Sequence, residues 1–285
     1  MKKTMNSGIL ALALATLAGF SIGARQTTAR AQEQEKIVID GSTTVGPIAK
    51  AFAEYYMSKN PNINVTVSES GSGNGATSLI NGACQIATMS RFMKDEEFKA
   101  AVAKGVFPVA HAIAVDGVAI VVHPSNPIQE LKTEQARGIY TGAIKNWKEL
   151  GGPDVAIVRV NRDTNSGTFE TFESLVMNKE KITPEAETTG SNGAMRQRVT
   201  STPGAIGYVG LGFLEGVKAL KINGVAPNPE TISSGQYPVS RALFMFTNGY
   251  PKLGSHLYEF VTLYLTPKGQ EIIQAKEFVP LTKYQ

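Results

Sequence analysis

The 285-residue sequence has few of the residues on which disulfides and metal sites depend. Its single cysteine, Cys84, cannot form a disulfide within the chain. The histidines are His111, His123 and His256, and none has a second ligand at metal-binding spacing. We therefore expect stability to come from a hydrophobic core, Cys84 to be a buried structural thiol, and the protein to use no metal or other cofactor.

Long apolar runs are also scarce, and the notable one lies near the N-terminus. Lys2 and Lys3 precede an apolar run at Ile9–Ala18, and Ala29-Arg30-Ala31 forms a small-x-small site. This pattern predicts a signal peptide over residues 1–31, cleaved from a periplasmic protein, with cleavage after Ala24 as an alternative. An uncleaved membrane anchor is disfavoured because a spanning helix needs roughly 20 apolar residues.

The chain beyond this segment carries no excess charge of either sign. Residues 1–31 contain four of the 28 basic residues and no acidic one, which leaves 24 basic residues against 24 acidic ones. The formal charge of +4 therefore comes from the predicted signal peptide and does not indicate binding to nucleic acid. We expect a monomer with no nucleic-acid partner.

Strands and helices alternate along the remaining sequence, which favours an α/β fold with a largely parallel sheet. Apolar or alternating segments predict strands at residues 36–40, 63–67, 85–89, 157–160, 205–209 and 240–247. Helical spacing and breaking residues predict helices at residues 47–59, 94–104, 133–140, 169–177 and 254–265, and a short helix that ends at Asn81.

The apolar stretch Val109–Val122 is too long for an ordinary strand and is interrupted by His111 and Asp116-Gly117. We interpret it as a strand that crosses between two domains, with the strand at residues 240–247 returning the chain. This interpretation divides the mature chain into lobe I, residues 32–117 and 239–285, and lobe II, residues 118–238.

Three turns rich in Gly, Ser and Thr each follow a predicted strand and precede a helix. They are Gly41-Ser42-Thr43-Thr44, Gly71-Ser72-Gly73-Asn74-Gly75 and Ser166-Gly167-Thr168. Each leaves unpaired backbone N–H groups at a helix N-terminus, where the helix dipole favours negative charge. Any one turn is explained equally well as a simple helix cap, but together they favour a site for a small oxyanion.

Two arginines occupy similar loop positions. Arg91 comes directly after a strand end, and Arg162 stands four residues before Ser166. A guanidinium offers planar paired donors that fit the oxygens of a tetrahedral oxyanion. An exposed or structurally paired arginine is the alternative at each position.

Asp116 interrupts an apolar strand, where a carboxylate needs partners. It is either the partner of a nearby arginine, or a turn residue before Gly117, or a detector of the proton on the ligand. In the last role, a carboxylate accepts a hydrogen bond from hydrogen phosphate and repels the unprotonated sulfate ion.

An ordered set of motifs covers nearly the whole mature chain and resembles the phosphate-binding component of high-affinity phosphate ABC importers. The motifs are Asp40-Gly41-Ser42-Thr43-Thr44-Val45, Ser70-Gly71-Ser72-Gly73, Ser90-Arg91, Asp116-Gly117, Asn146-Trp147, Arg162 with Ser166-Gly167-Thr168, and Ile206-Gly207-Tyr208-Val209. The spacing from Arg162 to Ser166-Gly167-Thr168 is the most specific of these.

The resemblance implies a type II-like periplasmic binding protein, with two α/β lobes, a two-strand hinge, phosphate in the cleft between the lobes and a membrane permease as partner. The residues implied to contact phosphate are Ser42, Thr43, Ser72, Ser90, Arg91, Asp116, Arg162, Ser166, Gly167 and Thr168. Some family members have an Asp where Arg91 stands, so Asp116 is assigned as the acceptor of the phosphate proton. Asn146-Trp147, residues 206–209 and Arg241 are interpreted as structural.

Three other functions remain as alternatives. A phosphate-ester hydrolase is disfavoured, because the sequence has no Gly-x-Ser-x-Gly elbow, no P-loop and no His/Asp cluster suited to two metals. A binding protein for arsenate, sulfate or molybdate uses the same turns; Asp116 disfavours sulfate and molybdate, and nothing in the sequence separates arsenate from phosphate. A regulatory or adhesive protein with the same fold is the third.

Overall fold

The computed structural model describes residues 35–282, so the predicted signal peptide, residues 1–31, lies outside the described residues. The described residues belong to one compact unit. They form a nine-stranded sheet, flanked by helices, and a separate two-stranded sheet. No helix within residues 35–282 is long and apolar enough to cross a membrane.

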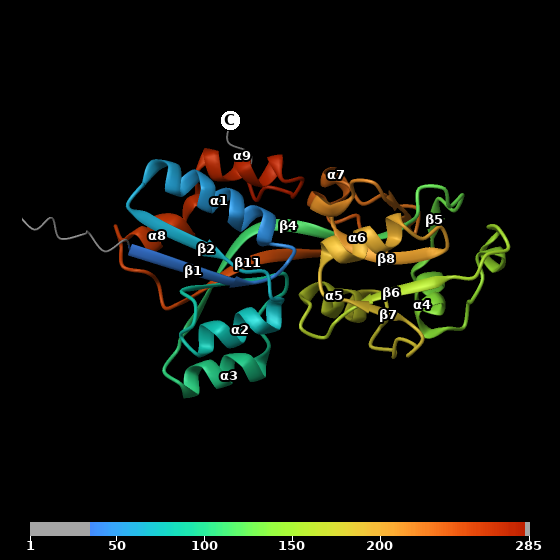
Figure 1. Cartoon of the computed structure of the whole chain (residues 1–285), viewed down its shortest axis with the longest axis horizontal. Helices are drawn as coiled ribbons and strands as arrows, with labels where there is room; N and C mark the ends of the chain where they lie inside the picture. Colours follow the sequence, from blue (N-terminus) through green and yellow to red (C-terminus); the bar gives the residue numbers. More distant parts are fainter. Residues whose placement is uncertain (1–34, 283–285) are drawn as a thin grey trace, which may run out of the picture. The chain divides into compact units, whose positions relative to one another are not determined.

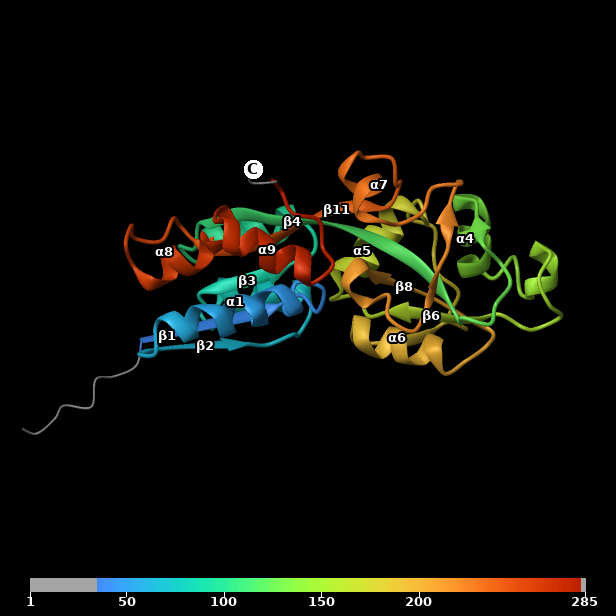
Figure 2. The same cartoon turned by 90° about the horizontal axis from the view of Figure 1, so that it is seen from above.

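Lobe I consists of a sheet covered on both faces. Its elements are β1 (Glu35–Gly41), α1 (Gly46–Lys59), β2 (Ile63–Val67), α2 (Ser72–Ile80), β3 (Ile86–Met89), α3 (Asp95–Ala103), β11 (Ser240–Asn248), α8 (His256–Val261), the 3-10 turn η3 (Leu263–Leu265) and α9 (Pro267–Ala275). Helices α1 and α9 lie side by side over one face (Figure 2), and α2 and α3 lie together on the other (Figure 1). Each face has its own hydrophobic cluster, around Phe52 on the first and around Leu79 and the buried Cys84 on the second.

Lobe II continues the same sheet. Its elements are β5 (Glu130–Leu131), α4 (Thr133–Thr141), η1 (Trp147–Leu150), β6 (Val158–Arg162), α5 (Gly167–Leu175), β7 (Glu187–Thr189), α6 (Asn192–Thr200), β8 (Ala205–Gly210), η2 (Leu211–Phe213), β9 (Lys218–Ala219), β10 (Lys221–Ile222) and α7 (Pro229–Ser233). Strands β8, β6 and β7 are parallel. A third hydrophobic cluster fills this lobe, with Trp147 buried and the rings of Phe172 and Tyr208 stacked at 4.0 Å between centroids.

One long strand, β4 (Pro108–Val122), belongs to both lobes, as the sequence predicts for this stretch. Its first part pairs with β11 as far as Gly117, and its last five residues pair with β8 from Val118 onward. The chain crosses back beside this point, since Val118 donates its N–H to Val239 just before β11 begins. The lobe boundaries stay a prediction, which the separate hydrophobic clusters favour.

The sheet differs from the expected largely parallel arrangement. The strand order is β2-β1-β3-β11-β4-β8-β6-β7, and β9 also pairs with β4. Strands are parallel within each lobe, but β4 and β11 run antiparallel to each other and to β8 and β3. The reason is that β4 takes the chain from lobe I to lobe II and β11 brings it back, so the two run in opposite directions.

The C-terminal helix predicted over residues 254–265 is interrupted. Helix α8 ends at Val261, and after η3 a separate helix, α9, begins at Pro267. Thr266 caps this second helix by accepting a hydrogen bond from Gly269, and proline fits the first helical position because its missing N–H is not needed there. Helix α6 is a further element that the sequence patterns did not predict.

Candidate anion-binding site

Three threonine hydroxyls and an asparagine meet where α1, α5 and α6 begin. Thr43 and Thr44 lie in the turn before α1, Thr168 is the second residue of α5, and Asn192 is the first residue of α6. The hydroxyls of Thr44 and Thr168 are 3.0 Å apart, and Asn192 Nδ2 donates to Thr43 Oγ1 and Thr44 Oγ1 at 3.0 and 2.9 Å. All four side chains are buried. Residues of both lobes therefore share this polar cluster.

Local hydrogen bonds fix the loops that carry these residues. Ser42 Oγ accepts the N–H groups of Thr44 and Val45 and so shapes the turn before α1. Ser166 caps α5 by accepting the N–H of Phe169. Both serines are thus partly occupied by the backbone.

Backbone donors remain available at three of the turns. Within residues 35–282, the N–H groups of Thr43, Ser72, Gly167 and Thr168 have no protein acceptor. Those of Ser72, Gly167 and Thr168 belong to the first turns of α2 and α5, where unpaired N–H groups and the helix dipole favour an anion.

The beginning of α5 approaches lobe I very closely at Gly167. A Cβ atom at this position would lie 2.6 Å from both Ser72 Oγ and Ser90 Oγ. These two hydroxyls are 3.3 Å apart, and Ser72 Oγ also accepts the N–H of Ser90. A side chain here would collide with both hydroxyls, so glycine lets the beginning of α5 approach the two serines closely.

Arg162 is buried at the end of β6 and points to the same cluster. Its Nε and Nη2 donate to the carbonyls of Thr189 and Gly190 at 3.2 and 3.1 Å, and Nη2 also reaches Thr43 Oγ1 at 3.4 Å. The other terminal nitrogen, Nη1, is buried without a hydrogen-bond partner. Burial lowers the pKa of Arg162, and the nearby positive charge of Arg241 acts in the same direction.

Asp116 is completely buried and forms an ion pair with Arg241. Its Oδ2 accepts Nε and Nη2 of Arg241 at 3.0 and 2.8 Å, and its Oδ1 accepts the N–H of Leu211 at 2.9 Å. Burial raises the pKa of this carboxyl, whereas the Arg241 guanidinium lowers it. Of the three roles considered from the sequence, the structure shows Asp116 as the partner of an arginine.

Arg91 has its guanidinium directed to carboxylates. Glu97 of the same lobe accepts two hydrogen bonds from it at 2.7 Å each, and Glu170 of α5 lies 2.5 Å from its Nε. Lys94 Nζ also lies 3.1 Å from Glu170. Arg91, Lys94 and Glu170 line a groove of about 430 Å³ between the loop after β3, helix α5 and β11.

Three polar residues of this cluster were not among the ligand contacts predicted from the sequence: Thr44, Asn192 and Arg241. Thr44 belongs to the motif Gly41-Ser42-Thr43-Thr44, so the sequence offered a reason to include it. Asn192 begins a helix with weak apolar periodicity, and Arg241 stands 125 residues from Asp116 in the sequence. Arg241 and Asp116 come together only through the pairing of β4 with β11, in which the two residues are directly opposite each other.

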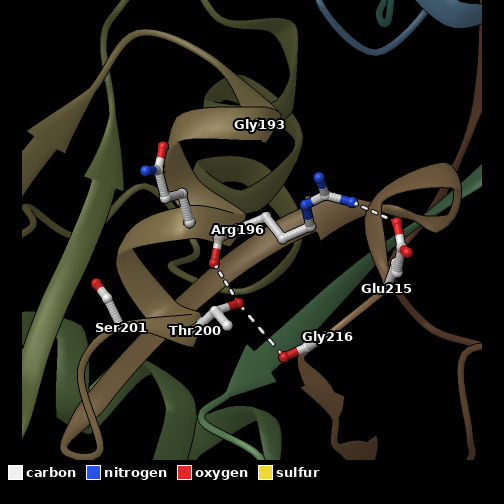
Figure 3. Close-up of a pocket in the computed structure, with 7 residues that line it drawn as sticks. Gly193, Arg196, Thr200, Ser201, Glu215 and Gly216 are labelled. Carbon is white, nitrogen blue, oxygen red and sulfur yellow. Dashed lines mark hydrogen bonds and ion pairs between the residues drawn. The ribbon is translucent and has the colours of Figure 1, made fainter.

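A larger hollow, of about 690 Å³, lies between α6 and the loop after η2 and is shown in Figure 3. None of the residues predicted to bind the ligand lines it. Its Arg196 pairs with Glu215 at 3.2 Å, so the charge of that guanidinium is balanced.

Comparisons with known proteins place this chain in a family. The profile of the PBP superfamily domain matches residues 26–267. The phosphate-binding protein PstS of Bacillus subtilis is 34% identical over 236 residues, which cover 81% of this chain and 77% of that protein. PstS of Borreliella burgdorferi is 34% identical over 261 residues, 87% of this chain and 91% of the relative.

Solved structures agree with the fold. A Clostridium perfringens protein, assigned to the substrate-binding proteins of phosphate ABC transporters and crystallised with bound phosphate, has a TM-score of 0.81 and 32% identity, covering 87% of this chain and 100% of that one. An ABC-type phosphate transport receptor from Vibrio cholerae has a TM-score of 0.69 and 32% identity, covering 85% and 99%. The predicted two-lobed α/β fold is confirmed, and the chain belongs to the PBP superfamily, in the family of the phosphate-binding proteins PstS.

Proposed function

We propose that this protein binds inorganic phosphate outside the cytoplasm and delivers it to the membrane permease of an ABC importer. The observation that carries the proposal is the buried Nη1 of Arg162, which has no partner beside a cluster of hydroxyls and free helix N–H groups. A buried guanidinium nitrogen without a partner is costly unless an acceptor binds there. The relatives that align over most of this chain are phosphate-binding proteins, which supports phosphate as that acceptor.

The proposed ligand contacts come from both lobes. Ser42, Thr43, Ser72 and Ser90 contribute hydroxyl or N–H donors from lobe I, and Arg162 with Ser166, Gly167 and Thr168 contributes donors from lobe II. The predicted contacts Arg91 and Asp116 already have their charges paired, with Glu97 and Glu170 and with Arg241. We assign Arg91 to the ion pairs that hold the lobes together at the groove, and Asp116 to the orientation of Arg241.

The mechanism is capture and release rather than chemistry. An oxyanion that contacts both lobes binds the closed arrangement more tightly than an open one, and so shifts the population toward closure. The permease then recognises the closed form. The family consists of substrate-binding proteins, and the proposed signal peptide directs the chain to the periplasm, where such a protein meets its ligand.

Replacement of Arg162 by alanine tests the proposal. Equilibrium dialysis of the mature, phosphate-stripped protein against radiolabelled phosphate should give tight binding for the wild type. Arg162→Ala should bind about tenfold more weakly or worse, which corresponds to a loss of ~1.4 kcal/mol or more. Arg196→Ala, an arginine of lobe II outside the cluster, is the matched control and should bind normally.

Competition separates the alternative ligands. Unlabelled phosphate should displace the label at lower concentration than sulfate or molybdate, and arsenate should compete because its shape and protonation match those of phosphate. Unchanged phosphate affinity in Arg162→Ala would reject the placement of the site between the lobes. Stronger displacement by sulfate or molybdate would reassign the protein to that oxyanion.

A further inference from the structure

We propose that Arg241 is a second cationic contact for the bound oxyanion and that Asp116 is its positioning residue. The inference rests on the proposed function, because it names further residues of the same site. It gives Asp116 a different role from that of a direct acceptor of the phosphate proton.

Arg241 contacts the polar cluster through one terminal nitrogen and leaves the other without a partner. Its Nη2 donates to Thr44 Oγ1 at 3.2 Å and to Thr168 Oγ1 at 3.0 Å, so the guanidinium touches the polar cluster directly. Its Nη1 is buried and has no partner. Arg162 shows the same combination of one engaged and one unpartnered terminal nitrogen beside Thr43. Two buried arginines therefore each leave a donor free beside adjacent threonines.

The two buried arginines place like charges near each other. Arg162 and Arg241 are close enough for the positive charge of Arg241 to disfavour the charged form of Arg162. Asp116 is the one completely buried carboxylate in the cluster, and Asp163, at 4.0 Å from Arg162, is partly exposed. Like charges that are buried together repel strongly at low dielectric. A bound anion relieves this repulsion, so the pair of arginines suits an oxyanion better than a neutral ligand.

Asp116 lies between the backbone of Leu211 and the guanidinium of Arg241. Both of its oxygens accept hydrogen bonds from the protein, and Oδ2 receives two of them from Arg241. The guanidinium of Arg241 thus links this carboxylate to the hydroxyls of Thr44 and Thr168. A carboxylate held in this way fixes the orientation of the arginine, much as outer carboxylates orient the ligands of a metal.

The location on the hinge explains why the pair matters for capture. Asp116 and Arg241 are opposite each other on β4 and β11, next to the point where both strands leave lobe I. Arg241 is a residue of lobe I, yet its partner Thr168 belongs to lobe II. The contact between them therefore exists only while the lobes are together, and a ligand that engages Arg241 favours that arrangement.

A double-mutant cycle tests the proposal through phosphate affinity. Arg241→Gln should weaken phosphate binding about tenfold or more, whereas Arg241→Lys, which keeps the charge, should lose less. Asp116→Asn should also weaken binding. The double variant Asp116→Asn with Arg241→Gln should bind no more weakly than Arg241→Gln alone, because Asp116 acts through the arginine.

The opposite result separates the two roles of Asp116. If Asp116→Asn weakens binding further in the Arg241→Gln background and also reduces the preference for phosphate over sulfate, Asp116 is the proton acceptor and the proposal is wrong. Wild-type affinity in Arg241→Gln would likewise reject it. Absence of phosphate binding by the wild type would instead reject the proposed function.

Single variants that leave one buried charge unpaired can fail to fold, so melting temperatures accompany each affinity. A measurement without mutation covers that case. In the ¹⁵N NMR spectrum of the wild-type protein, addition of phosphate should shift the guanidinium resonance of Arg241 as well as that of Arg162. A shift of Arg162 alone would reject a contact with Arg241.

Discussion

Gly167 lies where the beginning of α5 in lobe II closely approaches lobe I. Its conformation is one that alanine also adopts, and alanine is favoured within helices. The obstacle is the partner surface, because an added Cβ would lie 2.6 Å from the hydroxyl oxygens of Ser72 and Ser90 and 3.2 Å from Cγ of Arg91. The cost of a side chain at this position therefore falls on contact between the lobes and not on the folding of lobe II.

We predict that Gly167→Ala weakens phosphate binding by roughly tenfold, the effect of ~1.4 kcal/mol, while the melting temperature of the ligand-free protein stays within a few degrees of wild type. Calorimetric titration and thermal unfolding measure the two quantities. Gly193→Ala on α6 is the control, since its Cβ would lie 3.8 Å from its nearest neighbour, Ser191. Equal affinities of the two variants would show that the lobes do not meet at Gly167 in the bound state.

At the residue scale, sequence reasoning found the residues whose signals are local. Arg162 and Ser166-Gly167-Thr168 stand in one short motif, and the structure brings Arg162 and Thr168 to the same threonine cluster. Arg241 has no such signal, because its partners Asp116 and Thr168 are distant in the sequence. Arg91 has a local signal, but the carboxylates of Glu97 and Glu170 that engage it depend on tertiary structure.

At the scale of elements, the strands and helices with regular apolar spacing could be predicted, and the others could not. Strand β2 (Ile63–Val67) has the predicted bounds because its alternating residues face a core on one side. Helix α6 buries only Asn192, Met195 and Val199, so it gives a weak apolar pattern. The break between α8 and α9 was missed, because the predicted helix ended at Leu265 and the Thr266-Pro267 pair that begins the second helix lies just beyond it.

The cap of α9 gives a prediction at this scale. Thr266 Oγ1 accepts the N–H of Gly269 at 3.0 Å, and α9 packs its buried face on the α1 side of lobe I. Thr266→Ala should lower the free energy of unfolding by about 1 kcal/mol, measured by urea denaturation. Phosphate affinity should not change, because α9 contributes no residue to the cluster. A large loss of phosphate affinity in a folded variant would contradict this separation.

At the scale of the whole molecule, an ion-pair network joins the lobes beside the proposed phosphate site. Glu170 of lobe II lies 2.5 Å from Arg91 and 3.1 Å from Lys94, both of lobe I, and Arg91 is also held by Glu97. The Arg91 and Glu170 side chains are 9% and 15% exposed, so solvent screens this pair less than a surface ion pair. The network exists only when the lobes are together, and it therefore favours closure.

We expect Glu170→Gln to release phosphate roughly three- to tenfold faster than wild type, the effect of ~0.7–1.4 kcal/mol. Stopped-flow displacement of bound phosphate measures the rate. Glu173→Gln on the same helix removes the same charge from a residue outside the network and should release phosphate at the wild-type rate. Equal rates for all three proteins would show that this network does not stabilise the closed lobes.

The most direct test of the account is a calorimetric titration of the phosphate-stripped mature protein with phosphate and then with sulfate. We predict tight binding of one phosphate per chain, because the cluster between the lobes offers one set of converging donors, and weaker binding of sulfate. Absence of phosphate binding, or tighter binding of sulfate, would contradict the central claim that the two lobes form a site for phosphate.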